Sequence, residues 1–240
     1  MQLFYSPDIT ADGYCTLDPE ESRHAVRVLR LREGDELNVT DGRGHLYACQ
    51  IVEANDKACV VDSKSPLPVL RSPFSVHLAV APTKNPSRME WLVEKAVEIG
   101  VGEITLLACD HSERSFLKTD RLEKLAVSAM KQSLHTVLPQ INPAVNLKDW
   151  LNSSPITHHS SLKFIAHCEA DKPRTPLAAA LQPGRDAVVL IGPEGDFSEG
   201  EIALALDKEF QPVSLGPSRL RTETAALYAV AAFNLINDLP

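Results

Sequence analysis

The spacing of hydrophobic residues divides the chain into two parts with different periodicities. In the first part, short alternating and apolar segments predict three strands, at 37–40, 46–52 and 58–62. Asp41-Gly42 lies between the first two strands and is typical of a hairpin turn. One helix interrupts the strands, because Asp18 can act as its N-cap and Pro19 fits its first position. The first part is therefore predicted to be mostly β.

After residue 73, compact apolar runs alternate with amphipathic segments. The apolar runs predict strands at 74–80, 103–107, 162–166, 187–191 and 213–215. The amphipathic segments predict helices at 86–99, 120–134 and 222–237, and a capping box of Ser198 and Glu201 begins another. This alternation predicts an α/β domain with a largely parallel sheet. The three prolines of Ser65–Pro73 predict an extended connector, so we place the domains at residues 1–68 and 74–240.

The predicted last helix is apolar almost all round from Ala225 to Ile236. Because a surface helix normally keeps a polar face, this one is expected to be enclosed by the fold or by a second subunit. The apolar stretch is too short to cross a bilayer, and the N-terminal residues lack the pattern of a signal peptide. The five cysteines are widely spaced and form no CxxC pair, which favours free thiols. We expect a cytoplasmic protein without membrane contact.

The formal net charge of −8 argues against strong, nonspecific binding to nucleic acid, which needs clustered Lys and Arg. Residues 1–70 carry 7 Lys and Arg against 12 Asp and Glu, and residues 71–240 carry 17 against 20. Four arginines nevertheless fall within ten residues, at Arg23, Arg27, Arg30 and Arg32. The charge therefore predicts weak binding to random RNA and recognition confined to a shaped target.

Several common catalytic motifs are missing from the chain. It contains no GxxxxGK[ST] phosphate loop, no GxGxxG after a strand and no GxSxG elbow. His111 and Glu113 have the HxE spacing of zinc deaminases, but no PCxxC follows to supply the other ligands. We expect no metal site.

Two segments contain residues that the predicted strands and helices do not explain by themselves. Gly192-Pro-Glu-Gly195 directly follows a predicted buried strand, where glycines let a ligand approach the backbone and Glu194 lies at the strand's carboxyl end. Arg219 and Arg221 precede the predicted last helix and oppose its dipole, which favours an anionic partner. The threonines beside them can be explained as helix caps.

These two segments resemble the C-terminal signature loops of the RsmE family, which are SPOUT-class methyltransferases acting on N3 of a uridine (U1498) in 16S ribosomal RNA. Gly192–Gly195 is similar to one loop and Leu215–Ala225 to the other. Shorter motifs of this chain also resemble motifs of the RsmE family and occur in the same order. They lie at residues 24–30, 34–35, 41–42, 84, 90–100, 113–115, 132–133 and 139. The resemblance therefore covers the whole chain.

The resemblance implies a PUA-like small β-barrel in residues 1–68 and a SPOUT α/β domain with a deep trefoil knot in residues 74–240. The second domain would bind S-adenosylmethionine and form a homodimer. The residues implied to hold the cofactor are Ala166, His167, Cys168, Leu190, Ile191, Gly192, Pro193, Glu194, Gly195, Leu215, Gly216, Leu220, Arg221, Thr222, Thr224 and Ala225.

Three residues near these loops are candidates for the chemistry. Glu223 or Glu194 could accept the uracil N3 proton or orient backbone amides, and the sequence leaves both roles open for each carboxylate. Arg221 is expected to stabilise negative charge on the uracil oxygens or to hold a phosphate, and Arg219 is a weaker candidate.

The implied partner is 16S ribosomal RNA of the small subunit. Basic residues expected to contact it are Arg23, His24, Arg27, Arg30, Arg32, Lys84, Arg88 and Arg114. The chain departs from the family pattern at three positions. Asp196 stands where the family usually has glycine, and Lys131 and His135 stand where it typically has Glu and Arg. These departures are expected to change fine RNA contacts more than the reaction class.

Two other functions fit part of the pattern. A SPOUT methyltransferase for transfer RNA would keep the fold, but the matched N-terminal domain favours the ribosomal target. A non-catalytic RNA-binding or ribosome-assembly factor would not need the intact Gly192–Gly195 and Leu220–Ala225 loops.

Overall fold

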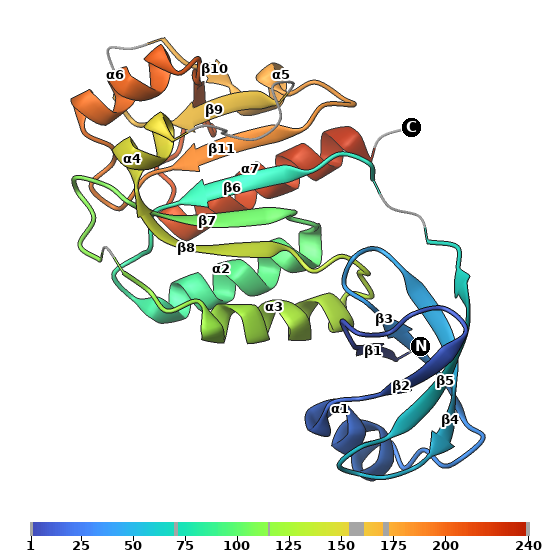
Figure 1. Ribbon diagram of the computed structural model, residues 1–240. Helices are drawn as coiled ribbons and strands as arrows, with labels where there is room; N and C mark the ends of the chain where they lie inside the picture. The colour runs from blue at the N-terminus through green and yellow to red at the C-terminus, as the bar shows by residue number, and fades with distance from the viewer. Residues whose placement is uncertain (1, 70–71, 115, 154–160, 170–172, 239–240) are drawn as a thin grey trace. The chain divides into compact units, whose positions relative to one another are not determined.

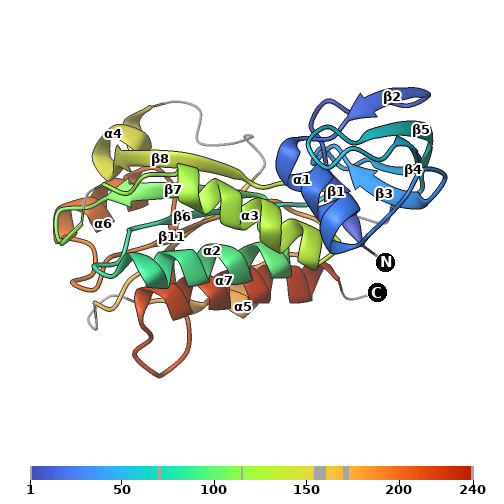
Figure 2. The same cartoon turned by 90° about the horizontal axis from the view of Figure 1, so that it is seen from below.

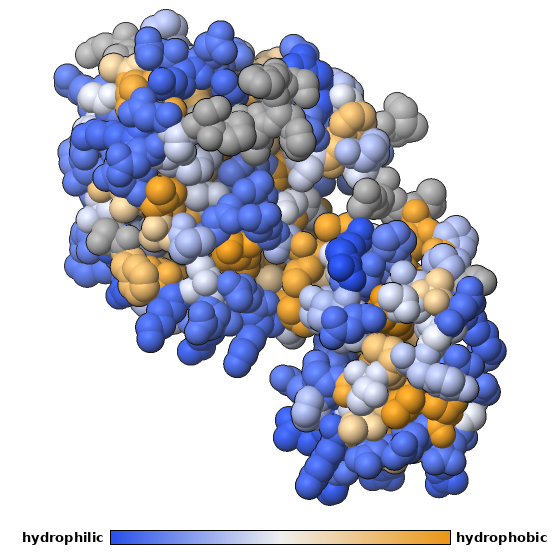
Figure 3. Space-filling model, in the orientation of Figure 1, coloured by the Kyte–Doolittle hydropathy of each residue, from blue (hydrophilic) through white to orange (hydrophobic). Residues whose placement is uncertain are grey.

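The computed structural model describes residues 2–69, 72–114, 116–153, 161–169 and 173–238. Ser115, part of one matched motif, lies outside them. The chain forms two compact units (Figure 1). The first unit comprises Met1–Arg71 with Val127–Leu138, and the second comprises Ser72–Ala126 with Pro139–Pro240. Most of the face seen in Figure 3 is hydrophilic, with hydrophobic side chains in separate patches.

A five-stranded sheet in the order β1-β3-β4-β5-β2 forms the first unit. Its strands are β1 (Leu3–Tyr5), β2 (Gly13–Thr16), β3 (Glu36–Thr40), β4 (Leu46–Glu53) and β5 (Val60–Leu67). The predicted hairpin is confirmed, since β3 and β4 pair antiparallel. Gly42 in its turn has φ +72, and a Cβ there would lie 2.8 Å from the Tyr5 ring. β5 continues through Ser65–Leu67, so the predicted connector is shorter than expected.

The helical segment of the first unit is α1 (Pro19–Arg23) followed by a π-helical turn, η1 (His24–Val28). Asp18 caps α1 as predicted, accepting hydrogen bonds from the Glu20 and Glu21 amides at 2.7 and 2.9 Å. The wider turn of η1 differs from the single regular helix that was expected. It accompanies the packing of Ala25, Val26 and Leu29 in the core of this unit.

The segment Val127–Leu138 packs within the first unit. The Thr136 carbonyl accepts hydrogen bonds from the Gly44 amide at 2.9 Å and from Thr40 Oγ1 at 3.1 Å. Lys131 Nζ pairs with Oε1 of the buried Glu21. Lys131, one of the departures from the family pattern, therefore neutralises a carboxylate inside this unit.

The second unit contains a seven-stranded sheet in the order β10-β12-β9-β11-β6-β7-β8. Its strands are β6 (Val76–Val80), β7 (Glu103–Ala108), β8 (Gln140–Asn146), β9 (Leu162–Ala166), β10 (Thr175–Pro176), β11 (Ala187–Ile191) and β12 (Gln211–Ser214). All neighbouring strands pair in parallel, which confirms the predicted sheet. The fully buried β11 lies between β9 and β6 near the middle.

Helices cover both faces of this sheet. They are α2 (Pro86–Ile99), the part of α3 (Asp120–Gln132) up to Ala126, α4 (Leu147–Asn152), α5 (Leu177–Ala180), α6 (Glu199–Asp207) and α7 (Thr222–Asn237). α2 and α7 lie side by side, and α7 packs against β6 and β11 (Figures 1 and 2). On the other face, α4 and α6 share a core with Val188 and Leu190.

The predicted helix ends are confirmed where local chemistry determines them. Gly100 ends α2 in the left-handed conformation with φ +111, and Ser198 and Glu201 form the capping box of α6. Within the single chain α7 is enclosed on one face, while Tyr228 and Leu235 are 44% and 65% exposed, so enclosure by a second subunit stays a prediction. Within the described residues, no helix is long and apolar enough to cross a membrane.

Candidate functional site

The three predicted cofactor loops follow β9, β11 and β12. These strands are neighbours and run in the same direction, so their carboxyl ends meet at one edge of the sheet. The loop after β6 joins the same edge, where the Ala81 amide donates to the Ile191 carbonyl at 3.0 Å. Ligands of open α/β sheets bind at this edge.

The loop after β11 makes a tight turn, called here the Gly192–Asp196 turn. The Asp196 amide donates to the Pro193 carbonyl at 3.0 Å. A Cβ on Gly192 would lie 3.1 Å from the Phe197 ring, and a Cβ on Gly195 would lie 3.1 Å from His111 Cβ. Close packing therefore favours glycine at both positions, since a Cβ would displace Phe197 or His111 by a few tenths of an ångström.

The first turn of α7 lies against the Gly192–Asp196 turn. Thr222 Oγ1 donates a hydrogen bond to the Gly192 carbonyl at 3.2 Å. Arg221 is the N-cap residue and provides no side-chain cap. The expected capping role of Thr222 is therefore wrong, and its hydroxyl joins the two signature loops instead.

Glu223 lies in that first turn and is only 7% exposed. Its Oε1 is 3.7 Å from Arg88 Nε of α2. Its Oε2 is buried and has no hydrogen-bond partner among the described residues. A buried carboxylate oxygen without a hydrogen-bond donor is rare, because it loses its hydrogen bonds to water on folding and forms none within the protein. Oε2 is therefore an unsatisfied acceptor that is shielded from solvent in this structure.

Glu194 is in a different environment. It is exposed, and its Oε1 accepts a hydrogen bond from the Lys84 amide at 3.1 Å. Lys84 Nζ pairs with Glu113 at 2.7 Å, which raises the pKa of the ammonium group. Arg114 Nε donates to the Lys84 carbonyl at 3.3 Å. Lys84 and Arg114 therefore lie at the same edge as Glu194.

The other predicted cofactor residues vary in exposure. Leu190, Ile191, Gly192, Pro193 and His167 are buried; Ala166, Leu215, Leu220 and Ala225 are half-buried; and Cys168, Gly195, Gly216, Arg221 and Thr224 are exposed. The His167 carbonyl accepts a hydrogen bond from Arg174. Gly216 has φ +107, and a Cβ there would meet no atom within 4 Å.

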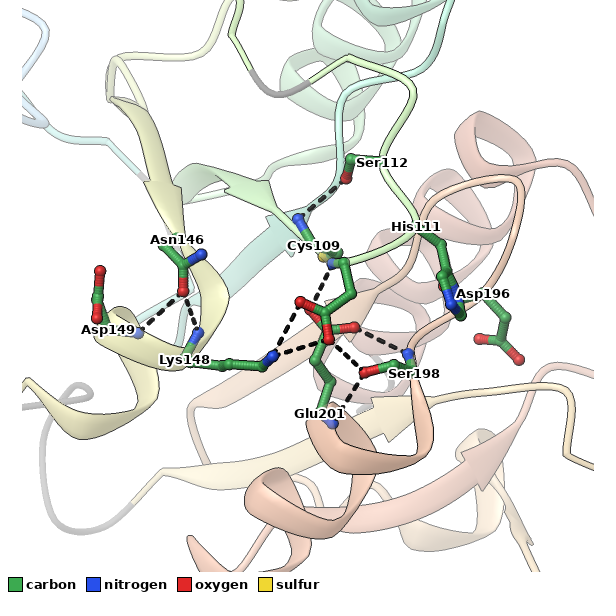
Figure 4. A network of polar contacts seen from close by, with 10 residues as sticks. Cys109, His111, Ser112, Asn146, Lys148, Asp149, Asp196, Ser198 and Glu201 are labelled. Carbon is green, nitrogen blue, oxygen red and sulfur yellow. Dashed lines mark hydrogen bonds and ion pairs between the residues drawn. The ribbon is translucent and has the colours of Figure 1, made fainter.

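A polar network that sequence reasoning missed lies beside this edge (Figure 4). Asp110 accepts hydrogen bonds from Lys148 Nζ at 2.8 Å and from Ser198 Oγ at 2.7 Å. Lys148 lowers the pKa of the Asp110 carboxyl. Glu201 accepts from the Asp110 amide at 2.8 Å. The capping box was the only sequence signal for this network, which fixes the start of α6.

The basic candidates of the first unit are mostly at its surface. Arg23, Arg27, Arg30 and Arg32 are exposed, and the His24 ring packs edge-on against Phe4. Arg27 pairs with Asp56, so its charge is partly neutralised. A shallow depression is lined by Val26, Arg30, Leu31, Arg32, Glu33 and Ala54.

The cysteines differ in exposure, since Cys168 is exposed and the other four are buried. The five cysteines are free, and burial raises the pKa of Cys49 to about 12 and raises that of Cys109. Among the residues that the structure describes, no group of three or more His, Cys, Asp or Glu side chains could hold a metal ion.

Comparisons with known proteins agree with this architecture. An RNA methyltransferase domain matches residues 70–234, and an RNA methyltransferase PUA domain matches residues 17–62. Ribosomal RNA small subunit methyltransferase E from Buchnera aphidicola is 27% identical, over 96% of this chain and 91% of that protein. These matches define an α/β fold of the RNA methyltransferase class with a PUA-like domain.

Solved structures are similar over the full length. A "probable rRNA-methyltransferase" from Porphyromonas gingivalis is 41% identical with a TM-score of 0.89, covering 99% of both chains. Ribosomal RNA small subunit methyltransferase E from Neisseria gonorrhoeae, bound to S-adenosyl methionine, is 26% identical with a TM-score of 0.82, covering 99% of this chain and 98% of that one. The chain belongs to the RsmE family of RNA methyltransferases.

Proposed function

We propose that the chain is an enzyme that transfers a methyl group from S-adenosylmethionine to N3 of U1498 in 16S ribosomal RNA of the small subunit. The observation that carries this proposal is Glu223, a buried carboxylate in the first turn of α7 whose Oε2 has no hydrogen-bond partner among the described residues. Family membership supplies the target, since relatives carry the name ribosomal RNA small subunit methyltransferase E.

The residues at the sheet edge suit S-adenosylmethionine. The space beside Gly216 is open, and Gly192 and Gly195 pack closely on Phe197 and His111, which fixes the turn at this edge. The cofactor would be held by Ala166–Cys168, Leu190–Gly195, Leu215–Gly216 and Leu220–Ala225. When bound, it supplies a methyl group on a positively charged sulfur. We further propose that this domain, residues 74–240, contains the deep trefoil knot that membership in the family implies. The packing of the last helix on the central strands β6 and β11 is compatible with it.

Three side chains of the protein are proposed to accept the proton, orient a loop and stabilise negative charge. Glu223 accepts the uracil N3 proton through its free oxygen, while Arg88 balances its charge. Glu194 orients the loop after β6, because its carboxylate already accepts the Lys84 amide. Arg221 stabilises the negative charge that develops on the uracil oxygens.

The first unit would dock the RNA. The proposed contacts are Arg23, His24, Arg27, Arg30 and Arg32 of a PUA-like small β-barrel, with Lys84 and Arg114 contributing from the second unit. The depression beside Arg30 and Arg32 offers a surface for an unpaired base or a phosphate. We also propose a homodimer, because Tyr228 and Leu235 lie seven residues apart on one side of α7 and are exposed in the single chain. We further propose that the protein is cytoplasmic, where ribosomal RNA is its substrate.

The deciding experiment is methyl transfer onto small subunits that lack the modification, followed by mapping of the methylated base. Methylation at N3 of U1498 is the expected result. Methylation of transfer RNA instead would change the substrate, and failure to bind S-adenosylmethionine in calorimetry would point to a non-catalytic RNA-binding factor.

A further inference from the structure

Asp196 has an unusual position at the end of the Gly192–Asp196 turn. Its φ is +64, in the left-handed region that favours glycine and that Asp and Asn tolerate better than other residues. In Figure 4 its side chain points away from Lys148, Ser198 and Glu201. The network that fixes α6 therefore does not account for this carboxylate.

Both oxygens of Asp196 accept backbone hydrogen bonds. Oδ2 accepts from the Cys168 amide at 2.6 Å, and Oδ1 accepts from the Phe197 amide at 2.8 Å. Cys168 follows β9, whereas Phe197 follows the turn after β11. Hydrogen bonds to a charged acceptor are short and roughly twice as strong as neutral ones. One side chain therefore joins the loops that follow two neighbouring strands.

The loop after β7 holds the other side of the same turn. His111 Nδ1 lies 3.1 Å from the Gly195 carbonyl oxygen and 3.2 Å from that of Asp196. Because carbonyl oxygens only accept, Nδ1 carries the proton and donates to both. The turn is therefore fastened from two sides, by His111 and by the bond from Asp196 to Cys168.

We propose that Asp196 is a positioning residue that sets the geometry of the cofactor-binding edge by tying the loop at Cys168 to the Gly192–Asp196 turn. This inference rests on the proposed function, because these two loops are the ones proposed to hold S-adenosylmethionine. Glycine at this position would keep the backbone conformation but would leave the Cys168 amide without its acceptor. The expected result is weaker cofactor binding with little change in turnover at saturation.

The test compares D196G and D196N with the wild-type protein. Both substitutions tolerate the left-handed backbone, and Asn retains one carbonyl oxygen of the two acceptors. E199Q is the matched control, because Glu199 is an exposed acidic neighbour on α6. Calorimetric titration with S-adenosylmethionine should give a Kd about tenfold higher for D196G, an intermediate Kd for D196N and an unchanged Kd for E199Q. The KM for the cofactor should rise in parallel, with kcat at saturation within about twofold of wild type.

Hydrogen exchange at the Cys168 amide, measured without cofactor, provides a readout independent of activity. Faster exchange in D196G with unchanged exchange in E199Q supports the tie between the loops. A wild-type Kd in D196G, unchanged exchange at Cys168, or a fall in kcat with an unchanged KM overturns the positioning role and leaves the proposed function standing. If D196G does not fold, D196N decides by the same criteria. Failure of the wild-type protein to bind S-adenosylmethionine overturns both proposals.

Discussion

Glu223 and Arg88 show how much of the site depends on contacts between distant residues. The sequence placed Glu223 beside the cofactor loops but assigned Arg88 to RNA. In the structure α2 and α7 lie side by side, and Arg88 Nε is 3.7 Å from the Glu223 carboxylate. No local pattern contains this information, because the pair depends on the packing of two helices from opposite ends of the second unit.

Replacing Glu223 with Gln should reduce kcat by about 10²- to 10³-fold, because the amide keeps the shape but cannot accept the N3 proton. The Kd for S-adenosylmethionine should change by no more than about twofold. Single-turnover methylation and calorimetry measure the two quantities, with E199Q as control. Full turnover by E223Q would remove Glu223 from the chemistry and leave Glu194 as the remaining carboxylate.

At the scale of elements, the sequence predicted several whose signals are local, although it missed α4, which Asn146 caps. The caps of α1, α2 and α6 and the turn at Asp41–Gly42 depend on neighbouring residues and were found. β8 was missed because Gln140–Asn146 includes Pro143 and has no fully buried residue. An edge strand tolerates both features, since one side of its backbone is unpaired. The π-helical turn η1 depends on core packing and has no comparable signal.

The strand β6 contains a buried titratable group, His77, near the Glu103 carboxylate. Burial lowers the pKa of His77 more than Glu103 raises it. Nε2 lies 2.8 Å from Thr105 Oγ1, and the ring packs edge-on against Trp150. The unfolded chain therefore takes up the proton at higher pH than the folded protein.

Titration of His77 should not change the free energy of unfolding at pH values above the ordinary pKa of histidine, about 6.5. Below that pH the free energy of unfolding should fall, because the unfolded chain binds the proton first. The loss should stop once the pH is below the lowered pKa of the folded state. Urea denaturation across this range measures it. H77Q should lack this component of the pH dependence, and identical pH profiles for the two proteins would contradict the assignment.

The end of α3 should stabilise the first unit through Lys131. K131M leaves the Glu21 carboxylate buried without its cation, so the unfolding free energy should fall by about 3 kcal/mol. The double variant E21M/K131M should recover most of this loss, because no unpaired charge remains. Equal destabilisation of the single and double variants in urea would show that side-chain packing, and not charge, is responsible.

At the scale of the whole molecule, composition alone misleads about the partner. A net charge of −8 suggests no contact with nucleic acid, yet the family acts on ribosomal RNA. The RNA contacts proposed for the exposed arginines of the first unit would reconcile the two. The chain should therefore depend on target shape and bind bulk RNA weakly at physiological salt.

The salt dependence of RNA binding should separate two of these arginines. R30A should reduce the slope of log K against log salt by about 1, as expected for one lost phosphate contact. R27A should reduce the slope less, because Arg27 already pairs with Asp56. Filter binding to small-subunit RNA at several salt concentrations measures both slopes. Equal slopes for both variants and the wild type would exclude this surface as the docking site.

Association of two chains should depend on the exposed side of α7. Y228E places a charge beside Leu235 and should convert a dimer to monomers in sedimentation velocity. Y14E, which changes an exposed tyrosine of the first unit, should leave the sedimentation coefficient unchanged. A dimeric Y228E would place the interface elsewhere, and a monomeric wild type would refute the homodimer.

The order of strands in the seven-stranded sheet also has a consequence for synthesis. β6 is the first strand of this sheet to leave the ribosome, but one of its two neighbours is β11, which follows much later in the chain. Until β11 has been synthesised, β6 can pair only with β7. The edge of β6 that later pairs with β11 then lacks its partner strand, and its apolar side chains are exposed. Such non-local pairing slows folding and prolongs the exposure of that edge. The nascent chain should therefore need protection from aggregation until residues 187–191 have emerged.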